Sequence, residues 1–158
     1  MNQSQPRSRI ARPLLWIGAI LGGLLLVFAI VMGVMMARMG EVPSELDYST
    51  TRSSDNGLFN VSYTASTGTV PVNQMHQWTL HVESADGQPV EDATITVDGD
   101  MPQHGHGLPT RPQVTQNLGN GDYLVEGIKF QMGGWWLMDF TITANGQTDA
   151  VHFNMMLE

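Results

Sequence analysis

The stretch GGWWLMDFTITANGQTDAVHFNMM, residues 133–156, decides the fold class of this chain. Apolar and polar side chains alternate on both sides of Asn145-Gly146, a dipeptide that favours a two-residue hairpin turn. In a strand, such alternation places every second side chain on the same face. The apolar face comprises Trp136, Met138, Phe140 and Ile142 before the turn and Val151, Phe153 and Met155 after it. The stretch therefore predicts two antiparallel strands with one buried face.

Similar apolar alternation and turn signals run upstream of this hairpin. About seven short strands without a convincing soluble helix are typical of an all-β fold, an antiparallel β-sandwich of immunoglobulin-like type. Only the architecture is predicted, because the chain has no cysteine and lacks the disulfide of true immunoglobulin domains. The further strands are predicted at residues 58–63, 75–84, 93–97, 113–118 and 123–128.

Residues 13–37 form an uncharged apolar stretch of 25 residues, which would be about 37 Å long as a helix. That length predicts one transmembrane helix, and no small-x-small cleavage site follows it, so we expect a retained signal-anchor. Arg7, Arg9 and Arg12 precede the span, which orients the tail at residues 1–12 toward the cytoplasm. The rest of the chain is then expected outside the cytoplasm.

Residues 38–56 are rich in Glu, Ser, Thr and Asp and have no apolar period, so they are predicted to be a linker. The folded domain is predicted at residues 57–158. From residue 41 onward the chain has three basic and fifteen acidic residues, a net charge of −12. Such a domain repels a phosphate backbone and attracts cations, which argues against a nucleic-acid partner.

Two patterns within the predicted span each have two interpretations. Gly18 and Gly22 are a small-xxx-small pair, which either allows a homodimer of closely packed helices or is the ordinary glycine content of a membrane helix. A methionine stripe either packs against lipid and neighbouring helices or passes copper(I) toward the outer domain. The stripe consists of Met32, Met35, Met36 and Met39.

The segment MPQHGHG, residues 101–107, gathers metal-capable side chains. His104 and His106 lie at i and i+2, and imidazole suits copper, zinc, nickel and iron, whereas a thioether favours copper(I). Two imidazoles are too few for a closed site, so Met101 and Met132 are candidate further donors. The alternatives are a loop that merely tolerates histidine and, for Met132, a core thioether beneath the tryptophans.

The other histidines lie on predicted strands. His76 shares the parity of the buried face, whereas His81 and His152 have the opposite parity and are expected to face solvent or a partner. A structural role is the simpler interpretation for each, with a reserve role in completing a metal site. No nucleophile-elbow serine, phosphate-binding glycine loop or cysteine indicates an enzyme.

The segments MPQHGHGLPT (101–110), GDYLV (121–125) and FQMGGWW (130–136) together resemble the YtkA-like domain family, which is related to FixH-like proteins. The resemblance covers roughly residues 57–157 and implies a bacterial β-sandwich domain that is membrane-anchored or secreted. It also implies copper handling or help in assembling a respiratory oxidase outside the inner membrane. The ligands that it implies are Met101, His104, His106 and Met132.

These observations predict a single-pass protein of the bacterial inner membrane whose periplasmic domain binds copper. We expect the ion to pass to or from a partner, a copper-accepting or oxidase-assembly protein, by ligand exchange. The alternative is a metal-free interaction module, in which Trp135-Trp136 and the histidine segment dock onto a membrane complex during its assembly.

Overall fold

The computed structural model describes residues 11–38 and 42–158, and the chain divides into two units, Met1–Glu41 and Val42–Glu158. Helix α1 spans Ala11–Arg38 and contains the whole of the predicted apolar span. In the part of the chain that is described, no helix meets the length and hydropathy needed to cross a membrane. Residues 1–10 of the predicted tail and Met39 of the methionine stripe lie outside the described residues.

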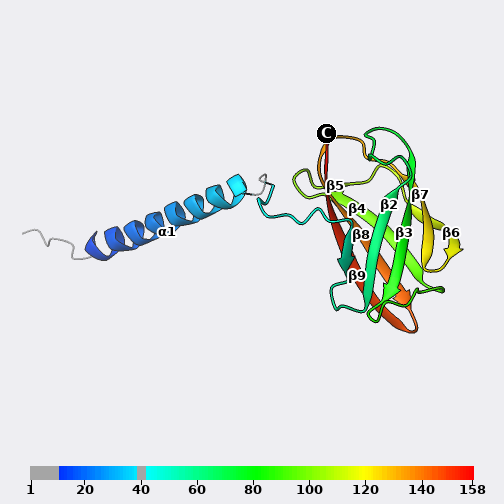
Figure 1. Cartoon of the computed structure of the whole chain (residues 1–158). Helices are drawn as coiled ribbons and strands as arrows, with labels where there is room; N and C mark the ends of the chain where they lie inside the picture. Colours follow the sequence, from blue (N-terminus) through cyan, green and yellow to red (C-terminus); the bar gives the residue numbers. More distant parts are fainter. Residues whose placement is uncertain (1–10, 39–41) are drawn as a thin grey trace, which may run out of the picture. The chain divides into compact units, whose positions relative to one another are not determined.

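The second unit is a β-sandwich of two antiparallel sheets that face each other (Figure 1). One sheet has the order β1-β2-β3-β7-β6 and the other the order β5-β4-β8-β9. The strands of the first sheet are β1 (Thr51–Ser53), β2 (Phe59–Ala65), β3 (His76–Ser84), β6 (Gln113–Gly119) and β7 (Asp122–Ile128). Those of the second are β4 (Thr94–Met101), β5 (His106–Gly107), β8 (Gly134–Ala144) and β9 (Gln147–Leu157).

The predicted hairpin at the C-terminal end is confirmed. Strands β8 and β9 pair antiparallel from Gly134↔Leu157 to Ala144↔Gln147. Asn145 and Gly146 turn the chain with φ values of 51° and 74°, the left-handed geometry that a two-residue hairpin turn requires. The hairpin sets the register of both strands, so their apolar faces point the same way.

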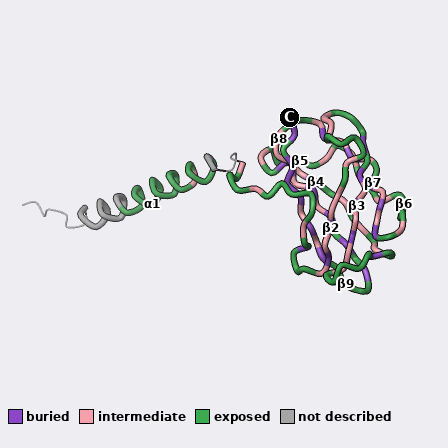
Figure 2. Tube along the Cα trace, viewed as in Figure 1, coloured by how far each residue is buried: buried purple, intermediate pink, exposed green. Residues whose placement is uncertain are grey.

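The core lies between the two sheets, and buried positions recur along the strands in Figure 2. Trp136, Met138, Phe140 and Ile142 of β8 are all 0 % exposed, as the alternation predicts. Trp78 and Leu80 of β3 meet them from the other sheet within the same cluster. Full burial of a side chain such as Phe140 contributes about 1.5–3 kcal/mol, so each buried position of the alternation stabilises the domain.

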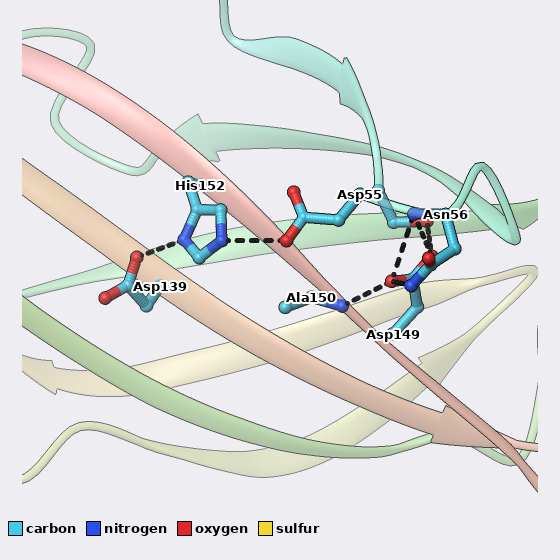
Figure 3. Close-up of polar contacts among 7 residues, drawn as sticks. Asp55, Asn56, Asp139, Asp149, Ala150 and His152 are labelled. Carbon is cyan, nitrogen blue, oxygen red and sulfur yellow. Dashed lines mark hydrogen bonds and ion pairs between the residues drawn. The ribbon is translucent and has the colours of Figure 1, made fainter.

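The predicted linker 38–56 is too long at its C-terminal end. Residues 51–53 form β1, which pairs with β2, and the next residues contact β9 through the carboxylate of Asp149 (Figure 3). Ser54 Oγ donates to Asp149 at 2.6 Å and Asn56 Nδ2 at 2.8 Å. Polar groups attach this segment to the sandwich, so a search for apolar periodicity could not predict that it belongs to the domain.

Candidate functional site

The predicted histidine loop is a tight turn between β4 and β5. Met101, the last residue of β4, pairs with His106 in register. The amides of His104 and Gly105 both donate to the carbonyl oxygen of Met101 at 2.9 Å, and Gly105 has a φ of 65° that favours glycine. The turn therefore presents His104 and His106 from a hydrogen-bonded frame.

The two imidazoles stack against each other. Their ring centroids lie 5.8 Å apart, with an angle of 24° between the ring planes. His104 is exposed, whereas His106 is half-buried against the edge of Trp136, with ring centroids 6.2 Å apart. The two imidazoles predicted to act together therefore lie side by side on the turn.

The β7–β8 loop, residues 129–133, forms the neighbouring wall. Gln131 Nε2 lies 3.0 Å from Nδ1 of His106 and donates to the carbonyl oxygen of Gly107 at 3.2 Å. Trp136 Nε1 donates to the carbonyl oxygen of Met132 at 3.1 Å, which fixes the loop over the core. The loop and the histidine turn are thus joined by side-chain hydrogen bonds.

The two candidate thioethers have opposite environments. Met132 is 40 % exposed, so its alternative interpretation as a core thioether beneath the tryptophans is wrong. Met101 is 0 % exposed, and its Cε packs so close to Gly134 that a Cβ there would lie 2.9 Å away. Met101 therefore belongs to the core beneath the turn, and Met132 is the thioether that solvent and a partner can reach.

The site contains nitrogen and sulfur donors, with few carboxylates. Among residues 11–38 and 42–158, no group of three or more His, Cys, Asp or Glu side chains is able to hold a metal ion. The arrangement instead offers two imidazoles on one turn and an exposed thioether on the adjoining loop. Such a mixed, incomplete donor set suits copper better than zinc or a hard cation.

The other histidines have structural partners. His76 is buried, as its strand parity predicts, and burial lowers its pKa against a weaker opposing effect of the hydrogen bond to Gln74. His81 lies 2.7 Å from Asp122 and 3.3 Å from Glu83. Burial alone would lower the pKa of His81, but the two carboxylates together raise it. The two outward-facing histidines, His81 and His152, thus link neighbouring strands by ionic contacts.

His152 lies between two carboxylates on the outer face of the second sheet (Figure 3). Its Nδ1 lies 2.5 Å from Asp139 and its Nε2 3.1 Å from Asp55. The hydrogen bond to Asp139 is the main cause of a raised pKa, which partial burial opposes. Both ring nitrogens are occupied, so His152 is not a reserve ligand for the distant turn.

Sequence reasoning missed Gln131 as part of the site. Gln131 touches a residue 25 positions away in the chain, and nothing in its sequence neighbourhood indicates that contact. Trp136 was predicted as a core residue, which it is, and in the alternative interpretation as part of a docking surface with the histidine segment. Its proximity to His106 follows from the pairing of β4 with both β5 and β8.

An antiparallel β-sandwich with a histidine turn at one end defines the class of domain to which this chain belongs. Residues 55–141 match the YtkA-like family, and the chain is a member of that family. The matched region includes the four predicted donors, so the resemblance seen in the sequence is confirmed.

No curated protein matches the chain. The chain is similar to a solved structure, the ZirS C-terminal domain, with 13 % sequence identity. The match covers 72 % of this chain and 80 % of that domain. Its TM-score of 0.34 is too low to support an argument about fold or function.

Proposed function

We propose that this chain is a copper-binding protein that takes up and releases the ion by ligand exchange. The observation that carries the proposal is the stacked pair of His104 and His106, with ring centroids 5.8 Å apart on one short turn. His104 has little packing role because it is exposed, whereas Met101 belongs to the core beneath the turn. Met132 offers a soft donor on the loop that Gln131 ties to this turn.

The incomplete donor set favours exchange over storage. A site with three or four closed protein ligands holds its metal, whereas open positions can be filled by donors of a second protein. The net charge of −12 from residue 41 onward raises the local concentration of cations around the domain. These features support a carrier that shares copper with a partner outside the cytoplasm.

Membrane anchoring is part of the proposal. It is supported by the uncharged stretch at residues 13–37, by the arginines before it, and by the exposure of the described leucine, isoleucine and valine side chains of α1. We also assign the sandwich to the immunoglobulin-like type. In such folds the first, second, fifth and fourth strands lie side by side in one sheet. When the short strands β1 and β5 are left out of the count, these four strands are β2, β3, β7 and β6, which have the same order here.

Copper titration of the purified full-length protein tests the proposal. Replacing both His104 and His106 with alanine should abolish copper(II) binding and weaken copper(I) binding, whereas Met132→Ile should weaken copper(I) alone. Copper(II) affinity should fall between about pH 7 and 5, because protons compete for imidazole. The control is His81→Ala, which removes an imidazole outside the site. A double-histidine variant that binds both copper states like the parent would disprove the proposed function.

A metal-free docking role is the second candidate. A groove of about 470 Å³ lies beside the C-terminal end of β9, and the exposed side chains of Tyr48 and Met156 contribute to it. The backbone at Leu157 adjoins the β7–β8 loop, since a Cβ on Gly133 would lie 3.0 Å from its carbonyl oxygen. An oxidase-assembly partner that binds wild-type and double-histidine protein equally, without copper, would favour this candidate.

A further inference from the structure

The side chain of Gln131 makes two contacts at the base of the histidine turn. Its Nε2 lies 3.0 Å from Nδ1 of His106 and 3.2 Å from the carbonyl oxygen of Gly107. Its Oε1 is buried and has no hydrogen-bond partner within the described part of the chain. The side-chain amide of Gln131 is therefore positioned by the hydrogen bonds of its nitrogen, and not by any hydrogen bond to its oxygen from the described residues.

The carbonyl of Gly107 determines which end of the amide faces His106. A carbonyl oxygen accepts hydrogen bonds and cannot donate them, so the amide atom beside it must be the NH₂ group. A flipped amide would place Oε1 of Gln131 against the oxygen of Gly107, with no proton between them. The two protons of Nε2 then serve two acceptors, Gly107 O and His106 Nδ1.

This orientation selects one tautomer of His106. Because Gln131 donates, Nδ1 must accept through its lone pair, and the single proton of the neutral ring then lies on Nε2. Trp136 packs edge-on against the same ring, at 6.2 Å between centroids and 63° between planes, and restrains its rotation. The neutral imidazole consequently has one lone pair able to bind a metal ion, and Gln131 covers it.

We infer that Gln131 is a positioning residue that reserves Nδ1 of His106 as the atom that receives copper. The inference rests on the proposed copper-binding function. Nδ1 contacts Gln131, the chain neighbour of Met132, so an ion bound at this nitrogen lies beside the loop that carries the exposed thioether. The Gln131 amide leaves Nδ1 when copper binds and returns when copper departs, so a hydrogen bond replaces the metal bond at each release.

The metal-free full-length protein provides the first test, by ¹⁵N nuclear magnetic resonance of the histidine rings. His106 should be protonated at Nε2, with a through-hydrogen-bond coupling between its Nδ1 and Gln131 Nε2. In Gln131→Glu the carboxylate can only accept, so the ring proton should move to Nδ1. Gln131→Leu should lose the coupling, and Gln113→Leu, at an exposed position, should retain it. An Nδ1-protonated wild-type ring, or no switch in a folded Gln131→Glu variant, overturns the inference.

The second test repeats the spectra with copper(I), which is diamagnetic. The wild-type protein should show the metal-induced shift at Nδ1 of His106 and lose the coupling to Gln131, whereas Gln131→Glu should show the shift at Nε2. A wild-type shift at Nε2 overturns this inference and leaves the proposed function intact. Absence of copper(I) binding by the wild-type protein overturns both.

Discussion

At the scale of single residues, the carboxylate of Asp149 holds the beginning of the domain to its last strand. The side chain is 3 % exposed and accepts hydrogen bonds from Ser54, Asn56 and the amide of Ala150. Burial alone would raise its pKa, but these donors together bring the pKa well below the ordinary range. The carboxylate is therefore favoured in the folded state and becomes costly to protonate.

We predict that Asp149→Asn lowers the thermal unfolding midpoint at pH 7. A depressed folded-state pKa gives stability that is present above the ordinary carboxyl pKa of about 4 and is lost as pH falls toward the folded value. The difference between wild type and variant should thus shrink below about pH 4. Calorimetry across this range measures it, with the exposed Asp92→Asn as control. An equal difference at pH 7 and pH 3 would contradict the proposed role of the carboxylate.

His152 gives a prediction of the opposite sign. Its pKa is raised, mainly by the hydrogen bond to Asp139, so its contribution is fully present below the unfolded value of about 6.5 and is lost as pH rises through the folded pKa. His152→Ala should cost up to about 1 kcal/mol at pH 6, since the pairs are partly exposed, and less at pH 9. Urea unfolding at both pH values measures this. Thr141→Ala, at an exposed position of β8 without an ionisable side chain, is the control.

At the scale of elements, the β8–β9 hairpin links sequence pattern to the fold most directly. Its two strands supply most of one face of the core, and its turn depends on left-handed backbone at Asn145 and Gly146. The β4–β5 turn carries the exposed His104 and the half-buried His106, and its place in the sheet depends on the pairing of β4 with β8. The rigid hairpin is thus the support on which the histidine turn is built.

We expect Gly146→Ala to destabilise the domain by about 1–2 kcal/mol. The φ of 74° is unfavourable for a residue with a Cβ, although no atom lies within 4 Å of the position where that Cβ would be. Gly146→Asn should cost less, because asparagine tolerates left-handed backbone. Chemical unfolding of both variants distinguishes backbone strain from a steric clash, and an asparagine variant as unstable as the alanine variant would argue against strain.

At the scale of the whole molecule, the boundary of the folded unit can be tested by truncation. Residues 42–158 should unfold cooperatively without α1 and in the presence of a chelator, because the core cluster lies entirely within this unit. A fragment of residues 57–158 lacks β1 and the Ser54 and Asn56 donors to Asp149, so its unfolding midpoint should be lower by about 4 °C or more. Equal unfolding midpoints for the two fragments would instead support the original prediction that the linker extends to residue 56. Disorder of the chelated longer fragment would show that metal is needed for folding.

The sequence by itself determined the all-β class, the C-terminal hairpin, the burial of its alternating side chains and the family. These features depend on interactions between near neighbours: alternation fixes which face is apolar, and Asn-Gly fixes the turn. The proximity of His104 to His106 was also predictable, because two residues separated by one position stay close in any extended or turn conformation. Each of these properties is local in the chain.

Only the tertiary structure decided which donors are accessible and what holds them. It buried Met101, exposed Met132, placed Gln131 against His106, and used residues 51–56 as part of the sandwich. Each outcome depends on the order in which strands pair and on contacts between distant residues, such as Ser54 with Asp149, 95 positions apart. A single hydrogen bond of this kind has no periodic trace in the sequence, because its two partners meet only after both sheets have formed.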